Sequence, residues 1–291
     1  MKRILFLTLL LCLASPSWAV TYYVGKSGSD ANSCATAQSS TAGNRKLTIN
    51  GASGGISCLA SGDTLIIGNG TYVESVTEDI PNGSMGSPTT VQAENRNLVI
   101  LRPTSEPAEY VMRFSGQSYI TVDGIVTDGV NVGANYGAFP SIADHIIIKN
   151  GTAQNGSGTF GSGIDGLWSN STFMNMDIIN NGAPASNLAH GIYMSGGPNN
   201  ILDGNRIRGS AAYGIVLYNS SGTIADTIVR NNTIYSNTTR GVSIDNTTTG
   251  TLFYNNLVYS NGRGVEILGS SNSVYFNTIY SNNDTCIGVR A

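Results

Sequence analysis

One short phrase recurs along the chain, and it restricts the fold more than any other feature. Each copy has an Asn, a short apolar strand, a polar turn and then a Gly followed by an aliphatic residue. The four clearest copies begin at Asn205, Asn232, Asn256 and Asn277 and lead to Gly214-Ile215, Gly241-Val242, Gly264-Val265 and Gly288-Val289. Toward the N-terminus, Asp177, Asn150 and Asp123 take the same place. A repeat of roughly 20 to 50 residues is typical of a solenoid.

The apolar residues within each copy alternate with polar ones, as in Ile215 and Leu217 or Val242 and Ile244. Alternation with a period of two predicts β-strands and argues against helices. A coil of two or three short strands buries no core alone, so the next coil must stack on it at about 4.8 Å. The sequence therefore predicts an all-β fold, a single-stranded parallel β-solenoid. In that fold Ile215, Val242 and Val265 point inward.

The repeated Asn fits a corner between strands. Its side-chain amide can bond to the Asn of the coil above and of the coil below, and Asn tolerates the left-handed backbone that a tight corner requires. We therefore interpret the repeated Asn residues as structural corner residues and not as ligands.

The chain divides into three parts on composition. Residues 1–19 read as a secretory signal peptide, with Lys2-Arg3, an apolar run from Ile4 to Ala14 and a cleavage site after Ala19. The run is too short for a membrane anchor, so we expect a secreted or periplasmic protein. Residues 20–72 lack the repeat and are expected to form an N-terminal cap and the first coil. Residues 73–291 form the parallel β-helix, incomplete at its C-terminus, where further chain or a partner would act as the cap.

The cysteines agree with an oxidising compartment. Cys34 and Cys58 are close in sequence and lie outside the repeat, so we expect them to form a disulfide. Cys286 is left over, and we interpret it as a small packed residue. Charged residues make up 11% of the chain and the net charge is -3, which excludes the basic stripe of a nucleic-acid-binding protein.

Several stretches carry a resemblance to a known superfamily. Tyr22-Tyr23-Val24, Ser61-Gly62-Asp63-Thr64 and Gly70-Thr71-Tyr72 resemble the N-terminal entry of secreted bacterial right-handed parallel β-helix proteins of the pectate-lyase-like superfamily. The later coils, such as His190-Gly191-Ile192-Tyr193, are similar to its repeats. The resemblance implies a right-handed helix. It leaves the activity open, because the superfamily includes polysaccharide lyases, glycoside hydrolases, uronan epimerases, tailspikes and surface proteins without known catalysis.

Two columns of side chains place chemistry on one face of the predicted solenoid. Residues at the same position in consecutive coils lie about 5 Å apart. The position before each repeated Gly holds Ser162, His190, Tyr213, Arg240, Arg263 and Ile287. The outward position of the strand that follows holds Asp165, Tyr193, Val216, Ser243, Glu266 and Arg290.

These columns fit an acidic polysaccharide as substrate. Arg240 and Arg263 would bind a uronate carboxylate and acidify the adjacent C5 proton, which His190 or Tyr213 would transfer. Tyr193, Asp165 and Glu266 are further candidate substrate-binding residues. The expected reaction is β-elimination, or a related one such as epimerisation. The alternative is a non-catalytic surface or adhesion solenoid that binds glycan, with the same residues as solvated side chains.

Lys149 is a further catalytic candidate, because the resembled superfamily contains lyases with a basic residue as base and Ca²⁺ held by acidic residues. It is the only lysine within the repeat region. Its neighbour Asn150 favours a corner position instead. The sequence lacks the run of acidic residues typical of a Ca²⁺ site, so calcium is left without an assigned site.

Overall fold

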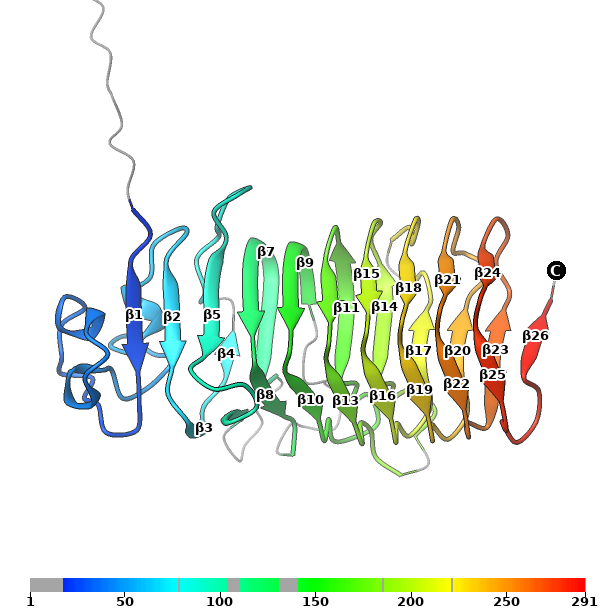
Figure 1. The fold of residues 1–291 in the computed structure, drawn as a ribbon, viewed down its shortest axis with the longest axis horizontal. Coiled ribbons are helices and arrows are strands. Elements are labelled where there is room, and N and C mark those ends of the chain that lie inside the picture. The colour runs from blue at the N-terminus through cyan, green and yellow to red at the C-terminus, as the bar shows by residue number, and fades with distance from the viewer. Residues whose placement is uncertain are drawn as a thin grey trace, which may run out of the picture.

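The computed structural model describes residues 18–77, 79–103, 110–130, 141–184, 186–220 and 222–290. Most of the expected signal peptide and the Gly- and Asn-rich segment 131–140 lie outside these residues. The described chain is a parallel β-solenoid whose strands stack side by side along its long axis (Figure 1). The predicted all-β fold is therefore confirmed.

Each full coil contributes a strand to each of three faces, and all pairings between the named strands are parallel. The first face consists of β1 (Thr21–Val24), β2 (Thr64–Ile67), β5 (Thr89–Ala93), β12 (Thr172–Met174), β15 (Ile201–Asp203), β18 (Ile228–Arg230), β21 (Leu252–Tyr254) and β24 (Ser273–Tyr275).

The second face consists of β3 (Gly70–Val73), β6 (Val99–Arg102), β8 (Ile125–Asp128), β10 (Thr152–Gln154), β13 (Asp177–Ile179), β16 (Arg206–Arg208), β19 (Thr233–Tyr235), β22 (Leu257–Tyr259) and β25 (Thr278–Tyr280). The third face consists of β4 (Val76–Thr77), β11 (Ile164–Ser169), β14 (Ile192–Gly196), β17 (Tyr213–Leu217), β20 (Arg240–Ile244), β23 (Arg263–Ile267) and β26 (Ile287–Val289). The long strands β7 (Met112–Asp123) and β9 (Ser141–Lys149) run through the third and first faces.

The core is a set of aliphatic stacks inside the coil. Ile192, Ile215, Val242 and Val265 pair in register from β14 to β23 and are fully buried or nearly so. The predicted inward direction of the last three is therefore confirmed. Each such side chain contributes roughly 1.5 to 3 kcal/mol by burial.

The register predicted for the last coil is wrong by two residues. Val265 pairs with Ile287, and Glu266 pairs with Gly288, so Arg290 does not continue the outward column. The error has a physical cause, because a shift of two residues in a strand keeps the same side chains on the inner face. Ile287 and Val289 are 49% and 72% exposed. Cys286 is exposed, so the prediction that it packs inside is also wrong.

A ladder of asparagine amides follows one corner of the solenoid. Asn232 donates from Nδ2 to Oδ1 of Asn256 at 3.0 Å and to the carbonyl oxygens of Leu202 and Arg230 at 2.9 and 2.8 Å. Its own Oδ1 accepts from Nδ2 of Asn205 at 3.0 Å. The ladder continues to Asn277. This corner role of the repeated Asn is therefore confirmed for the four clearest copies.

The three predicted repeat positions nearer the N-terminus, Asp123, Asn150 and Asp177, do not belong to this ladder. Asn150 and Asp123 are joined to each other by a side-chain hydrogen bond and lie in the row of Asn175. Asp177 is a strand residue that pairs with Arg206. Asn150 adopts the predicted left-handed backbone, with φ of 56°, but in the four clearest copies it is adopted by the residue before the ladder Asn. These residues are Gly204, Asn231, Asn255 and Phe276, with φ from 55° to 67°.

A second ladder follows the other end of the same short strands. Asn237 donates to Oδ1 of Asn261 at 2.9 Å, and Asn261 donates to Oδ1 of Asn282 at 3.1 Å. The sequence contains the signal for it, because each of these residues lies five positions after an Asn of the first ladder. The buried polar groups at the corners on both sides of the second face are thus hydrogen-bonded.

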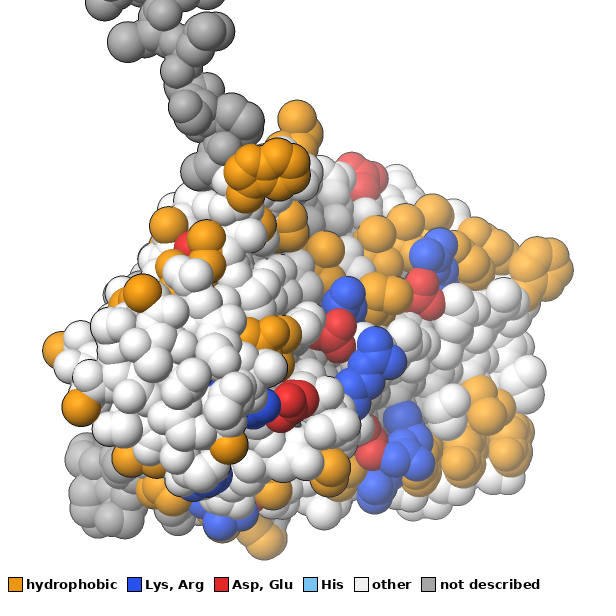
Figure 2. Space-filling view, turned by 60° about the vertical axis from the view of Figure 1, so that its left-hand side comes forward, with side chains coloured by type: hydrophobic (Ala, Val, Ile, Leu, Met, Phe, Trp, Pro, Cys, Tyr) orange, Lys and Arg blue, Asp and Glu red, His pale blue; other side chains and the backbone are white. Residues whose placement is uncertain are grey.

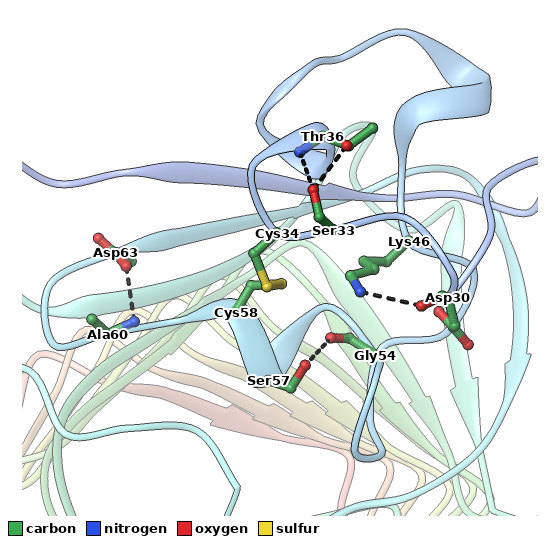
Figure 3. The surroundings of a disulfide bond; sticks show 10 residues. All are labelled: Asp30, Ser33, Cys34, Thr36, Lys46, Gly54, Ser57, Cys58, Ala60 and Asp63. Atoms are coloured by element: carbon green, nitrogen blue, oxygen red, sulfur yellow. Dashed lines mark hydrogen bonds between the residues drawn. A yellow bond between two sulfur atoms is a disulfide. The ribbon is translucent and has the colours of Figure 1, made fainter.

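Loops with three short 3₁₀ turns cover the N-terminal end, beyond the paired strands β1 and β2 (Figure 1). The turns are η1 (Thr36–Gln38), η2 (Ala42–Asn44) and η3 (Ile56–Cys58). The disulfide between Cys34 and Cys58 joins two of these loops, as predicted, with Cα atoms 5.4 Å apart (Figure 3). Nearby, the carboxylate of Asp63 accepts the backbone N–H groups of Val20 and Ala60.

The first ladder generates a stability prediction. In an Asn232→Asp protein the carboxylate cannot donate to Leu202, Arg230 or Asn256, and it is buried without a cation. We expect the free energy of unfolding to fall by about 3 kcal/mol or more, measured by denaturant titration. Asn255→Asp is the matched control, because residue 255 is exposed and Asp tolerates its left-handed backbone. Equal stability of both variants would contradict the role of the ladder.

Candidate functional site

A groove of about 440 Å³ lies on the third face, over strands β11, β14, β17 and β20. It is bounded by side chains from these strands and from the turns at both of their ends. The lining residues are Phe160, Asp165, Asn187, Leu188, His190, Tyr193, Tyr213, Val216, Tyr218, Arg240, Ser243, Asp245 and Leu268. The groove therefore runs across four consecutive coils.

The floor of the groove is the outward column expected from the sequence. Asp165 pairs with Tyr193, Tyr193 with Val216, and Val216 with Ser243. Because outward positions of stacked strands lie about 4.8 Å apart, these four residues form a continuous row. Sugar units of an extended polymer repeat at roughly this spacing, so the row matches such a ligand in geometry.

One side of the groove brings together three of the predicted residues. The ring of His190 lies 5.1 Å from the ring of Tyr213, centroid to centroid. Arg240 donates from Nη1 to the phenol oxygen of Tyr213 at 2.5 Å, and its guanidinium carbon lies 4.9 Å from that ring. The phenol oxygen of Tyr213 is thereby held beside the guanidinium of Arg240.

Arg240 also takes part in an ion pair. Its Nη2 lies 2.9 Å from Oε2 of the buried Glu266, while its Nε is buried without a hydrogen-bond partner. The arginine that the sequence assigns to a substrate carboxylate is therefore already partly neutralised by the protein. Its position relative to Tyr213 is fixed from two sides.

His190 is a buried, neutral imidazole. Burial lowers its pKa to about 4, so it carries no charge near neutral pH. Its Nδ1 accepts the backbone N–H of Tyr213 at 3.4 Å. In the neutral ring the proton then resides on Nε2, and His190 can donate a hydrogen bond but does not supply positive charge.

The pKa of Asp165 is raised, whereas that of His190 is lowered. Burial raises its pKa to about 7, although hydrogen bonds from Ser162 and from the backbone of Gly166 lower it. A large fraction of this carboxyl group is protonated at neutral pH, so it can donate a hydrogen bond to an anionic ligand. Burial likewise raises the pKa of the neighbouring Tyr193, whose phenol is hydrogen-bonded to Ser220 at 3.1 Å.

The structure places Arg263 and Glu266 outside the groove. They line a separate hollow of about 200 Å³ near the last coil. Arg263 is paired there with Asp284 at 2.7 Å. The two arginines expected to act together thus lie in different hollows, and each is bound to a carboxylate of the protein.

Lys149 also lies away from the groove. It ends β9 on the first face, opposite Met174, and its Nζ is 3.4 Å from Oδ2 of Asp123. Among the residues that the structure describes, no group of three or more His, Cys, Asp or Glu side chains is arranged to hold a metal ion. The same part of the chain contains no helix long and apolar enough to cross a membrane.

The opposite side of the groove was not predicted from the sequence. Tyr218, Asp245 and Leu268 come directly after the paired residues Leu217, Ile244 and Ile267 of the three strands. They form a third column. The repeat could have revealed it, because each of these residues directly follows a strand of the third face. Phe160 and Leu188 come from turns of irregular length, and no sequence signal places them here.

Comparisons with known proteins agree with the fold. A family model described as the right-handed β-helix region matches residues 113–290. No curated protein matches the sequence. The structure of the pectate lyase Pel9A is similar, with a TM-score of 0.62 and 18% identity over 93% of this chain and 77% of that one.

Two further solved structures are similar at low identity. An alginate lyase from Paenibacillus sp. str. FPU-7 has a TM-score of 0.57 and 16% identity, over 81% of this chain and 97% of that one. The A-module of a mannuronan C-5 epimerase from Azotobacter vinelandii has a TM-score of 0.56 and 14% identity, over 76% of this chain and 68% of that one. At these identities the likeness shows the right-handed β-helix fold.

The raised pKa of Asp165 generates a pH prediction. The pKa of Asp165 in the folded protein, about 7, lies above the ordinary value of 3.8. The contribution of this group to wild-type stability is therefore lost as pH rises from about 4 to about 7. An Asp165→Asn protein lacks this loss. We expect it to gain stability relative to wild type over that interval, by up to about 1.4 kcal/mol per pH unit, and then to level off.

Denaturant unfolding of both proteins from pH 4 to pH 9 measures this difference. The depressed pKa of His190 contributes equally to both proteins and cancels. Ser243→Ala, a change on the same floor without a titratable group, is the control and should show no pH-dependent difference. A constant difference between Asp165→Asn and wild type would refute the perturbed carboxyl group.

Proposed function

Because this chain belongs to the right-handed β-helix family, we propose that it binds a uronate-containing polysaccharide in the groove on its third face and cleaves it by β-elimination. The similar structures support this choice, because pectate lyase, alginate lyase and mannuronan epimerase are all named for polymers of uronic acids. Their identity to this chain is too low to carry the activity over, so the proposal depends on the groove.

The observation that carries the proposal is the cluster of Tyr213, Arg240 and His190. β-Elimination on a uronate needs a base for the C5 proton and a group that stabilises the charge that develops on the carboxylate. Tyr213 supplies an oxygen beside a guanidinium at 2.5 Å. All three side chains lie at one side of the groove floor, whose residues are spaced at about 4.8 Å, close to the repeat of sugar units in an extended polymer.

The roles follow from the geometry. In the reacting form, the phenol oxygen of Tyr213, which faces Arg240, is deprotonated and takes the C5 proton. The electron pair of that bond forms the C4–C5 double bond, and the C4–O bond breaks with its electron pair going to oxygen. That oxygen then receives the proton from the phenol of Tyr213. His190 donates a hydrogen bond from Nε2 to the sugar, which positions the ring.

Asp165 would bind a different sugar of the same chain, because its strand lies three strand spacings, about 14 Å, from the strand of Arg240. In its protonated form it donates a hydrogen bond to a hydroxyl group of that sugar. The raised pKa near 7 makes this form available at neutral pH. Arg240 is the residue at the uronate carboxylate, and Glu266 shares its charge.

Binding without turnover is the second candidate function. The observation that favours it is the pairing of both predicted arginines with carboxylates of the protein, Arg240 with Glu266 and Arg263 with Asp284. In this case the row of Asp165, Tyr193, Val216 and Ser243 would hold a glycan chain at the surface without reaction. The formation of an unsaturated product separates the two candidates.

The protein acts outside the cytoplasm. Residues 1–19 have the composition of a secretory signal peptide. The Cys34–Cys58 disulfide is a bond that forms and persists in an oxidising compartment. An extracytoplasmic location also gives the groove access to polysaccharides of the surroundings.

The assignment of the base is tested by Tyr213→Phe. Removing the phenol oxygen leaves the ring against His190 but takes away the base, so we expect turnover to fall about 100-fold or more, with glycan binding changed much less. The ultraviolet absorbance of the unsaturated product measures turnover. Tyr235→Phe is the matched control, because Tyr235 stacks on Tyr259 at 5.0 Å on the second face.

Arg240→Lys provides the second arm of this test. Lysine keeps the charge but cannot contact Tyr213 and Glu266 in the same planar geometry, so turnover should fall while the fold is kept. Wild-type turnover in both Tyr213→Phe and Arg240→Lys would reject this cluster as the reaction centre.

A further inference from the structure

The groove is poor in positive charge, and this restricts the substrate. Resting on the proposed function, we propose that the groove selects glycans in which single uronates are separated by uncharged sugars, and that it discriminates against polymers with a carboxylate on every sugar.

Inside the groove the carboxyl groups outnumber the cations. Arg240 is the only Lys or Arg among the described residues that line it, whereas two aspartates, Asp165 and Asp245, line it. Arg240 is moreover paired with Glu266 at 2.9 Å. One partly neutralised guanidinium can accept one uronate, and a further uronate would find no second cation among the described lining residues, but would face Asp245 or the largely protonated Asp165.

Most of the positive charge elsewhere in the described chain is also paired with carboxylates. All Lys and Arg residues except Lys2 and Arg3 lie in the described part of the chain. Most of them lie beside carboxylates. The pairs are Arg45–Glu94, Arg96–Asp123, Arg102–Asp128, Lys149–Asp123, Arg206–Asp177, Arg208–Asp177, Arg230–Asp203, Arg263–Asp284, Arg263–Glu266 and Arg290–Glu266.

The surface shows the same arrangement. On the face drawn in Figure 2, basic and acidic side chains lie next to one another along the solenoid. Such neighbours cancel each other's field at a distance, and the net charge of the chain is negative, at -3. The protein therefore lacks the positive surface potential that would attract a polyanion and offset its repulsion.

Apolar side chains at the rim fit uncharged sugars. Phe160, Leu188 and Tyr218 are 42%, 50% and 44% exposed although they are large and apolar, and all three line the groove. Sugar rings present C–H faces that pack against such side chains. A uronate at these positions would lose hydration of its carboxylate without gaining a cation.

Asp245 is the residue that we assign to this discrimination. It lies on the side of the groove across from the Arg240 cluster, in the column of Tyr218 and Leu268. Its Oδ1 accepts the backbone N–H and the hydroxyl of Thr247 at 3.3 and 3.1 Å. These bonds hold the carboxylate in place, where it repels a second uronate of a bound chain.

The experiment compares oligosaccharides of equal length and different charge density. Hyaluronan and rhamnogalacturonan backbone oligosaccharides carry a uronate on every second sugar, polygalacturonate and alginate oligosaccharides on every sugar, and a neutral galactan on none. Calorimetry measures binding and ultraviolet absorbance measures elimination, at low and high salt. We expect the alternating glycans to bind at least about tenfold more tightly than the fully charged ones at low salt.

Asp245→Asn keeps the acceptor for Thr247 and removes the charge. We expect this variant to bind fully charged oligosaccharides about three- to tenfold more tightly than wild type, with little change for the alternating ones. The gain should decrease at high salt, because the Debye length falls from about 10 Å at 0.1 M to about 3 Å at 1 M. Asp203→Asn on the first face removes the same charge away from the groove and should leave the selectivity unchanged.

The outcomes separate this inference from the proposed function. Fully charged glycans that bind as well as or better than the alternating ones would overturn the inference and leave β-elimination standing. The predicted order of binding without any unsaturated product would reject β-elimination and leave the selectivity standing. No binding of any of these glycans would overturn both.

Discussion

Everything in this protein depends on the parallel hydrogen-bonded stacking of each coil on the next. Because the strand spacing is fixed at about 4.8 Å, residues at equivalent positions become neighbours along the axis. The same register produces the aliphatic stack of Val242 and Val265, the amide ladder of Asn232 and Asn256, and the groove floor. The Asn ladders allow this register to persist, because they satisfy the buried backbone groups at the corners, which strands cannot pair.

The fold could be predicted because the repeat occurs many times in the sequence. The errors in strand register and in the assignment of Asn residues to the ladder arise where the repeat allows two alignments. Ile287 and Val289 flank a Gly, so two registers two residues apart bury the same kind of side chain, and only the length of the preceding loop decides between them. Pairs such as Asn231-Asn232 place an exposed left-handed Asn before a buried ladder Asn. From the sequence alone, a single Asn such as Asn150 could be aligned either with the exposed left-handed Asn or with the buried ladder Asn of such a pair.

The candidate site could be predicted only as far as stacking determines it. Columns bring His190, Tyr213 and Arg240 together because each lies at one repeated position. Which carboxylate an arginine contacts depends on side-chain direction and on loops of unequal length, so the pairing of Arg240 with Glu266 was not predictable. This pairing changes the interpretation of the site, because the guanidinium expected to be free for a ligand is shared with a carboxylate of the protein.

The central claim is that a uronate binds with its carboxylate at Arg240 and its C5 proton toward the oxygen of Tyr213. The most direct measurement is a crystal structure of the Tyr213→Phe protein with a bound uronate-containing oligosaccharide, since this variant holds the substrate without cleaving it. We expect the sugar chain to lie along Asp165, Tyr193, Val216 and Ser243, with the uronate carboxylate in contact with Arg240. An oligosaccharide bound on another face, or in the groove with its carboxylate away from Arg240, would contradict it.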